Sequence, residues 1–408
     1  MNVEELVRQT LREQAAGQTS TGPGFADRVL VVRLRRRRRG FAGVAAATAA
    51  VVAVAVGVPL LDSGKEDARP AGIVQQGGIS AHPDQSPPRE TIAAGDAVLA
   101  AYYTVETVGR TDDEAVAVRT YSLLDPGTGR YEKDPRWSYV AVAPGLRTAA
   151  VLERELPARR IGLLDLATGE VERWIPAPRG AGAVAFSYDG GRLVATTYDA
   201  NPDLRVKVRN AEGGEAWMAP YGQSSRTGFS VLGLASGDAS WSPVDAGRNI
   251  NARQDFAFTR SGDGVYSQVI GGKDGMQQFH DLTGRKVAGP ANERYLRSDV
   301  SARLSPDGRL AALGLAKEVA GSPGKGYSSI RDPRTGEEIT RVRGGELLAW
   351  ADDQRLIGWE RVTSLEEEYR PRLVLVTIGS DKVVPLSGVR EPDESPDRLE
   401  WEPVFARR

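Results

Sequence analysis

The sequence contains no cysteine, and its 408 residues include only two histidines, His82 and His280. The lack of cysteine excludes disulfide bonds, thiolate metal ligands, cysteine nucleophiles and a lipoprotein attachment thiol. No two histidines lie at metal-ligand spacing, and no Asp-x-Asp-x-Asp-Gly calcium loop is present. The net charge of −1 gives no overall electrostatic case for nucleic-acid binding. We therefore expect no metal, no cofactor and no nucleic-acid partner.

Catalytic patterns are also missing from the sequence. There is no Gly-x-Ser-x-Gly motif, and His280 is the one histidine in the predicted exported domain. His280 stands beside Asp281 in a repeated turn, so we interpret it as a surface residue of a sheet. His82 falls in a predicted linker and receives no role. The acidic clusters 112–114 and 366–368 are interpreted as solvated loops. We expect no catalytic residue and no enzyme activity.

One long uncharged stretch is present. Residues 41–61 carry no charge and follow a run of arginines. Helical rise over this stretch gives about 31 Å, against roughly 30 Å of bilayer hydrocarbon. The pattern predicts a single transmembrane helix over residues 40–61. The alternative is a cleaved twin-arginine signal, but the apolar run exceeds the usual signal core of about 7–15 residues, which favours an uncleaved anchor.

The arginine run predicts the orientation of this helix. Positively charged flanks stay in the cytoplasm, whereas the other flank, residues 62–67, is mixed in charge. We therefore expect residues 1–39 to form a cytoplasmic head in a cell-membrane protein, with everything after residue 61 outside. The residues that determine this topology are Arg35, Arg36, Arg37, Arg38 and Arg39.

The head contains a short amphipathic pattern over residues 2–16. Its apolar side carries Val3, Leu6, Val7 and Leu11. Such a helix either rests on the inner leaflet or docks into a groove of a cytosolic protein. Three glutamates against two arginines on the polar side argue modestly for the protein groove, because an anionic leaflet repels acids. We predict these four residues as a partner-binding stripe.

The amino-acid composition changes twice beyond the apolar run. Residues 62–95 are rich in Gly, Pro, Ser and Gln, which predicts a disordered linker. From residue 96 to residue 408, short apolar runs alternate with turn signals, and no convincing long helix interrupts them. The 46 glycines and 24 prolines of the chain agree with many turns and short strands. We predict one all-β extracytoplasmic domain over 96–408.

Two turn-centred units repeat within this domain. The first is a strand, an Asp, a Thr-Gly turn and a second strand, at residues 123–131, 163–171, 279–287 and 330–339, with a degenerate copy at 208–217. The second centres on an Asp-Gly turn, at residues 184–195, 256–266 and 302–313. In such turns Asp bonds its own backbone two residues on, and Gly supplies positive φ. The two units alternate, so each period predicts four strands. Asp125 and Asp165 lie 40 residues apart, a spacing typical of propeller blades.

These turns resemble those of WD40-like and TolB-like β-propellers. The resemblance is carried by Ser305-Pro306-Asp307-Gly308 and by the Asp-x-x-Thr-Gly turns. The whole layout, a short head, an arginine run and a propeller, resembles the membrane-anchored propeller proteins of actinobacteria. The chain has no Gly-His start and no Trp-Asp end to its repeats, so the hydrogen-bond relay of strict WD40 repeats is not implied.

The repeats predict six four-stranded blades, with a possible seventh. The blade intervals are about 97–138, 139–178, 181–220, 228–290, 296–343 and 346–386. The fourth is long, and turn signals over 236–247 could hide the seventh blade. Residues 399–405 read as a last strand that completes the first blade, which removes exposed edges.

Three functions are compatible with this organisation. The first is a non-catalytic binding module, in which the propeller presents loops to an extracytoplasmic protein or ligand as a sensor or scaffold. The second is an anti-sigma-like regulator, in which the head controls a cytosolic partner such as a sigma factor; no zinc-type anti-sigma motif is present. The third is a propeller enzyme of the lyase or lactonase kind. We favour the first, because such enzymes use histidines or metals that this chain has almost none of.

Overall fold

The computed structural model describes residues 78–209, 214–221, 224–246, 253–269, 276–318, 326–361, 370–390 and 400–408. All of them belong to a compact unit that starts at Ala68. Every regular element in these residues is a β-strand, which confirms the all-β prediction. None of the described segments is a helix long and apolar enough to cross a membrane. The predicted transmembrane helix over 40–61 and the head over 1–39 lie outside the described residues, as do Val3, Leu6, Val7 and Leu11 and the arginines Arg35 to Arg39.

The first sheet joins strands from both ends of the domain. Its central order is β26, β3, β4 and β5, with β1 and β2 added beside β3, and β11 and β12 added beside β4. The bounds are β1 Ile79–Ser80, β2 Ala93–Ala94, β3 Ala97–Gly109, β4 Glu114–Asp125, β5 Arg130–Asp134, β11 Leu204–Arg209, β12 Glu215–Met218 and β26 Trp401–Arg407. The two short strands β1 and β2 fall inside the interval predicted as linker, so the folded domain begins before residue 96.

The second sheet is long and bends at its middle strand. Its order is β6, β7, β8, β9, β10, β13 and β14. The bounds are β6 Trp137–Val142, β7 Thr148–Glu153, β8 Ala158–Asp165, β9 Glu170–Phe186, β10 Arg192–Tyr198, β13 Arg226–Gly233 and β14 Ala239–Pro243. The first half of β9 pairs with β8, and its second half pairs with β10. Strand β9 therefore belongs to two four-stranded groups. One holds β6, β7, β8 and β9, and the other holds β9, β10, β13 and β14.

Three smaller sheets complete the described part. The first holds β15 Ala257–Phe258, β16 Gly264–Gln268, β17 Gln277–Asp281 and β18 Lys286–Val287. The second holds β19 Ala311–Glu318, β20 Gly326–Arg331 and β21 Glu338–Arg343, extended by a bridge between Leu304 and Ala311. The third holds β22 Glu346–Trp350, β23 Arg355–Arg361, β24 Pro371–Thr377 and β25 Val383–Pro385. All strand pairs within these sheets are antiparallel.

The repeated turns form as the sequence predicts. Asp125 Oδ1 accepts the backbone N–H of Gly127 at 2.7 Å, and Gly129 has φ of 69°. In the second unit, Asp307 Oδ1 accepts the backbone N–H of Arg309 at 3.0 Å, and Gly308 has φ of 74°. The carboxylate replaces a missing backbone partner, and glycine relieves the steric cost of the left-handed conformation. Local chemistry thus sets each hairpin.

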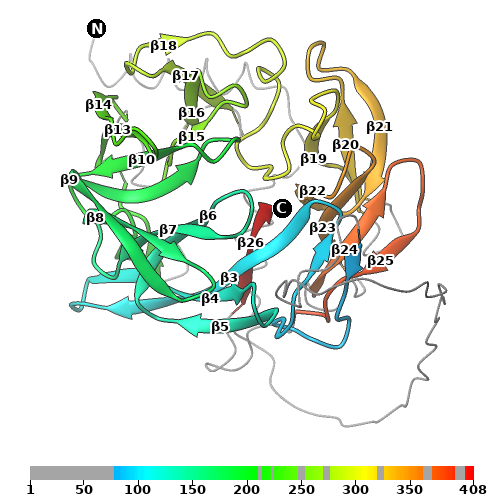
Figure 1. Ribbon diagram of the computed structural model, residues 1–408, viewed down its shortest axis with the longest axis horizontal. Helices are drawn as coiled ribbons and strands as arrows, with labels where there is room; N and C mark the ends of the chain where they lie inside the picture. Colours follow the sequence, from blue (N-terminus) through cyan, green and yellow to red (C-terminus); the bar gives the residue numbers. More distant parts are fainter. Residues whose placement is uncertain are drawn as a thin grey trace, which may run out of the picture. The chain divides into compact units, whose positions relative to one another are not determined.

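The sheets pack face to face in sequence, and the last packs on the first. Shared apolar clusters join the first sheet to β6–β9, the β10 group to β15–β16, β19–β21 to β22–β24, and β22–β24 back to β3 and β26. Polar contacts join the β15–β18 sheet to the segment before β19. Among them, Arg303 stacks on Tyr266 at 3.7 Å and donates to Gln277 at 2.9 Å. This closed circuit of twisted antiparallel sheets is the architecture of a β-propeller. Figure 1 shows β26 near the middle, with β5, β18 and β25 toward the outside.

Strand β26 closes the circuit as expected. It pairs with β3 from Trp401 opposite Thr104 to Arg407 opposite Ala97. Trp401 is 1 % exposed and meets Trp359 of β23 edge to face, with ring centroids 5.1 Å apart. The predicted last strand therefore completes the first sheet.

Two predicted blade intervals were wrong. Residues 204–218 do not belong with 181–198, because β11 pairs with β4 of the first sheet. Residues 228–243, placed in the predicted fourth blade of 228–290, instead extend the sheet of β10 through β13 and β14. The turn signals from residue 236 onward mark the β13–β14 hairpin and supply no separate sheet. Pairing between strands that are far apart in the sequence, and not the order of the repeats, determines which strands share a sheet.

Candidate ligand-binding face

The first residues of the inner strands meet at one face, which we call the upstream face. The inner strands are β26, β6, the second half of β9, β15 and β22. Arg253, just before β15, lies 5.2 Å over the ring of Tyr139 in β6 and donates to the Gly182 carbonyl of β9 at 2.8 Å. Three successive groups of strands therefore contribute to this face.

Asp203 holds two arginines on the upstream face. Arg119 of β4 donates to its two carboxylate oxygens at 2.7 and 3.1 Å. Arg253 donates to the same two oxygens at 2.7 and 2.6 Å. Burial alone would raise the pKa of Asp203, but the hydrogen bonds and charges of Arg253 and Arg119 outweigh it and hold the pKa well below its usual range. This arrangement ties β4, the segment before β11 and the segment before β15 together.

A second carboxylate completes this cluster. Asp255 accepts from Arg253 at 3.2 Å and from the hydroxyl of Tyr198 at 2.6 Å. Burial raises the pKa of Tyr198, and the negative charge of Asp255 adds to the effect. The phenol therefore stays protonated and donates. With two arginines against two aspartates, the cluster is balanced in charge and its groups are mutually satisfied.

Two glutamates on the other side of this face are less well compensated. Glu402 of β26 pairs with Arg390 at 3.1 Å and stands opposite Tyr103 of β3. Glu346 begins β22, and among the described residues its carboxylate has no ion pair. Reduced hydration and then the charge of Glu402 raise the pKa of Glu346, and Arg390 only partly offsets them. Glu346 is exposed, and an acid without an ion pair at the mouth of a propeller is available to a positively charged ligand.

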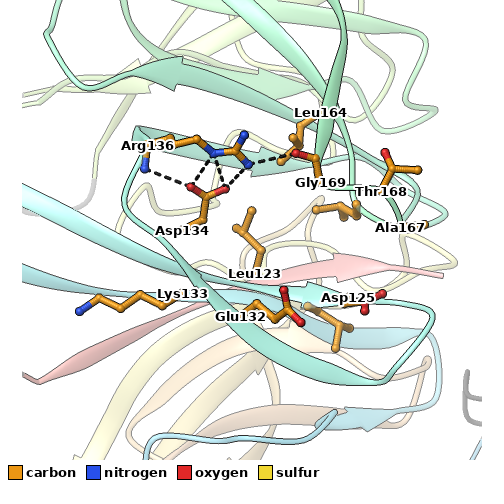
Figure 2. A pocket seen from close by; sticks show the side chains of 12 residues that line it. Leu123, Asp125, Glu132, Lys133, Asp134, Arg136, Leu164, Ala167, Thr168 and Gly169 are labelled. Carbon is orange, nitrogen blue, oxygen red and sulfur yellow. Dashed lines mark hydrogen bonds and ion pairs between the residues drawn. The ribbon is translucent and has the colours of Figure 1, made fainter.

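A pocket also lies between the β4–β5 hairpin and the β8–β9 turn (Figure 2). Its volume is about 300 Å³. Figure 2 shows Asp134, Arg136 and Gly169 joined by hydrogen bonds at one side of it. The lining residues are Leu123, Leu124, Asp125, Glu132, Lys133, Asp134, Arg136, Leu164, Leu166, Ala167, Thr168 and Gly169.

The polar groups of this pocket are already engaged with one another. Arg136 donates to Asp134 at 2.7 Å and to the Gly169 carbonyl at 3.0 Å, and it stacks on Trp137 at 4.8 Å. Trp137 Nε1 also donates to Asp134 at 2.8 Å. Burial would raise the Asp134 pKa, but these hydrogen bonds lower it. We interpret the pocket as part of the packing contact between the first sheet and the β6–β9 group. We therefore place the candidate site on the upstream face.

The two histidines lie in different settings. We expected His280 at the surface of a sheet, but its side chain is only 2 % exposed and packs edge-on to Phe256, 5.8 Å between ring centroids. Burial, with the positive charges of Arg226 and Lys286, lowers the His280 pKa to about 4. His82 lies 3.3 Å from Glu90 and bridges to Ser387. In the described part of the chain, no group of three or more His, Asp or Glu could hold a metal ion.

Sequence reasoning missed the upstream cluster. Arg119 and Asp203 are 84 residues apart, and Arg253 and Asp203 are 50 apart. Arginine and aspartate are normally solvated, so nothing in their local sequence distinguishes them from surface charges. The one local signal is that Asp203 follows the strand β10 in a turn with Asn201, whose side chain accepts its N–H at 2.8 Å.

No family model matches the chain, and no curated protein matches it. Among solved structures, TolB from Acinetobacter baumannii aligns at 16 % identity and a TM-score of 0.37, over 75 % of this chain and 66 % of that chain. Hydrazine synthase from Kuenenia stuttgartiensis aligns at 14 % identity and a TM-score of 0.34, over 65 % of this chain and 68 % of that chain. Scores this low carry no argument here, and the fold rests on the strand pairing and the shared cores described above.

Proposed function

We propose that the chain is a non-catalytic, single-pass membrane protein that presents a β-propeller outside the cell membrane as a binding module. In this proposal the propeller has six four-stranded blades, and the layout is of the membrane-anchored actinobacterial kind. The binding surface is the upstream face, and the partner is a protein that carries basic side chains.

The observation that carries this proposal is Glu346. Its carboxylate has no ion pair among the described residues, and reduced hydration together with the charge of the neighbouring Glu402 raises its pKa. Acids held in this way cost stability in the free protein, and a cationic partner would relieve that cost. The other charges of the face, those of Asp203, Arg119 and Arg253, neutralise one another and give the surface a fixed shape.

Site-specific photocrosslinking in cells tests the binding surface. A photoreactive residue at position 346 of the full chain should give a discrete protein adduct. A matched probe at position 384 is the control, because Val384 is 43 % exposed on the outer strand β25. Replacement of Glu402 by Lys should abolish the adduct by repelling a basic partner. Identical adducts at 346 and 384, or none at 346, would reject the upstream face as the contact.

Reporter fusions test the orientation. Alkaline phosphatase fused after Ala71 should be active, and the same reporter fused after Thr21 should be silent. Replacing Arg35 to Arg39 by Ser should weaken this preference, because these charges supply most of the asymmetry across the predicted span. The reverse pattern of activities would overturn the topology.

The second candidate, an anti-sigma-like regulator, rests on the apolar stripe of the head. We expect a peptide of residues 1–30 to capture a cytosolic protein, and the double variant Leu6→Asp, Leu11→Asp to lose it. Equal capture by both peptides would leave the head as a passive anchor.

A further inference from the structure

The opposite face of the propeller, where the inner strands end, brings three side chains into one stack. The ring of Tyr188 lies between two guanidinium groups. The Cζ atom of Arg260 is 3.2 Å from the ring centroid, and the Cζ atom of Arg407 is 3.3 Å from it. We call this group the downstream stack.

The stack lies at the centre of the ring of sheets. Arg407 ends β26 in the first sheet, whereas Tyr188 lies in the turn between β9 and β10. The four-stranded group β6 to β9 lies between the first sheet and the group of β9, β10, β13 and β14, so Arg407 and Tyr188 come from groups that are not neighbours around the ring. Arg260 follows β15, one sheet farther on. Contacts between non-adjacent groups of strands place these side chains toward the centre of the ring.

The two positive charges of the stack have no counter-ion. Among the described residues, neither Arg260 nor Arg407 forms an ion pair within 4 Å. One guanidinium N–H of Arg260 donates to the Pro306 carbonyl, and one of Arg407 donates to the Tyr188 carbonyl. The other N–H groups of both guanidiniums have no hydrogen-bond acceptor among those residues.

The nearest carboxylates are engaged elsewhere. Glu293 accepts the backbone N–H of Arg260 at 2.7 Å and pairs with Arg303 at 3.1 Å. Asp307 accepts from the Ser305 hydroxyl at 2.7 Å within its own turn. Burial lowers the Arg260 pKa, Tyr188 partly offsets this effect, and the charge of Arg407 lowers the pKa further against smaller opposing effects of Glu293 and Asp307. The stack is therefore an uncompensated positive site.

We propose that the downstream stack is an oxyanion-binding site, in which Arg260 and Arg407 together hold one phosphate or carboxylate group at the edge of the Tyr188 ring. Guanidinium is the side chain best suited to this role, because its fixed fork donates parallel hydrogen bonds to two oxygens of one group. Two forks on opposite faces of one ring converge on an anion at the ring edge. Tyr188 acts as the spacer that keeps the two cations apart.

An anion titration of the purified full-length chain tests this proposal. The probes are inorganic phosphate and acetate, each at constant ionic strength, and the readout is the thermal midpoint. Wild type should show a saturable rise of a few degrees with one of them, because a ligand bound to the folded state alone stabilises it. The more effective probe distinguishes a phosphate from a carboxylate ligand.

Matched variants assign the effect to the stack. Arg260→Gln and Arg407→Gln should each weaken half-saturation at least tenfold. Arg309→Gln should leave it unchanged, because Arg309 is highly exposed and its one ion pair among the described residues is with Asp307 of its own turn, at 3.7 Å. If the glutamine variants fail to fold, Arg260→Lys, which keeps the charge but loses the fork, should bind more weakly than wild type.

Two results would overturn the proposal. One is the absence of a saturable shift in wild type with both probes. The other is an undiminished shift in Arg260→Gln or Arg407→Gln, or in Arg260→Lys where the glutamine variants do not fold. The inference goes beyond the proposed protein partner and does not rest on it, since crosslinking at position 346 and anion titration at the opposite face succeed or fail separately.

Discussion

Asp203 accepts a bidentate pair of hydrogen bonds from Arg253, at 2.7 and 2.6 Å, although 50 residues separate them. Both side chains are largely buried, with 3 % and 15 % of their surface exposed. Because Arg119 binds the same carboxylate, one anion holds two cations away from water. Removal of the anion would leave Arg119 without an ion pair among the described residues and Arg253 with Asp255 alone, at 3.2 Å. Loss of one partner of a buried ion pair is among the most destabilising changes.

Asp203→Asn should therefore lower the free energy of unfolding by about 3–5 kcal/mol. Urea unfolding of the full-length chain measures it. The control is Asp238→Asn, because Asp238 is exposed in the β13–β14 turn and forms no ion pair among the described residues. Exposed changes of this kind stay within about 0.5 kcal/mol. Equal effects of the two substitutions would contradict a structural role for the clamp.

The same residue should affect acid stability. The folded pKa of Asp203 is lowered, so the folded state releases this proton more readily than the unfolded chain, whose pKa is about 3.9. The stabilisation is complete above that value and is lost as pH falls below it. Asp203→Asn should lack this component, so the stability difference between variant and wild type should shrink below about pH 4.

His280 should cause a separate loss of stability on acidification, at pH values above those at which Asp203 takes up its proton. Its folded pKa is lowered to about 4 from an ordinary 6.5, so the unfolded chain takes up the proton first as pH falls. Stability is therefore fully present above pH 6.5 and decreases toward pH 4. Between pH 7 and pH 5 wild type should lose about 2 kcal/mol more than His280→Phe, which keeps an aromatic ring beside Phe256. Parallel pH curves would show that the histidine is not buried as described.

Glu346 should behave in the opposite sense. Its pKa is raised in the folded state, so the charged form is disfavoured there, and the penalty disappears at low pH, where both states are protonated. Glu346→Gln should raise the thermal midpoint at pH 8 and have no effect below pH 4, because the ordinary pKa is about 4.3. Glu400→Gln, with a carboxylate that lies 3.8 Å from Arg390, is the control and should not stabilise. A lower midpoint for the Glu346 variant at pH 8 would contradict the electrostatic cost of the charged carboxylate, on which the proposed binding face depends.

The closing strand should be essential to the whole domain. Trp401→Ala would remove a side chain that is 1 % exposed, at a cost of about 3–5 kcal/mol. Val384→Ala is the control, since Val384 is 43 % exposed. A deletion of residues 400–408 should give a single cooperative transition at a much lower temperature. Unchanged melting would mean that β26 does not close the ring.

The sequence predicts the features that depend on neighbouring residues. Asp125 and Gly129 determine their turn through hydrogen bonds within a few positions, so the hairpins could be recognised directly. The pairing of β11 with β4 joins Leu204 to Val116 and depends on which edges remain free after folding. No turn signal encodes that choice, and the blade boundaries between 181 and 290 were misplaced as a result.

The two charged clusters could not be predicted from the sequence for a related reason. Arginines such as Arg119, Arg260 and Arg407 look like ordinary surface residues in the sequence, because each one finds its neighbours only across the assembled ring. The burial of His280 follows from the face on which β17 presents it, since its neighbour Asp281 turns toward solvent. A shift of one residue in strand register would reverse the two.

The pairing of β26 with β3 also bears on biosynthesis. Trp401 donates a hydrogen bond to Ser86 across 315 residues of chain, so the ring cannot close before nearly the whole domain has been made. Until then β3 presents an unpaired edge, which invites strand addition from other molecules. Long-range pairing of this kind is slow. If the domain is exported as an extended chain, a holding chaperone on the far side of the membrane would protect that edge during translocation.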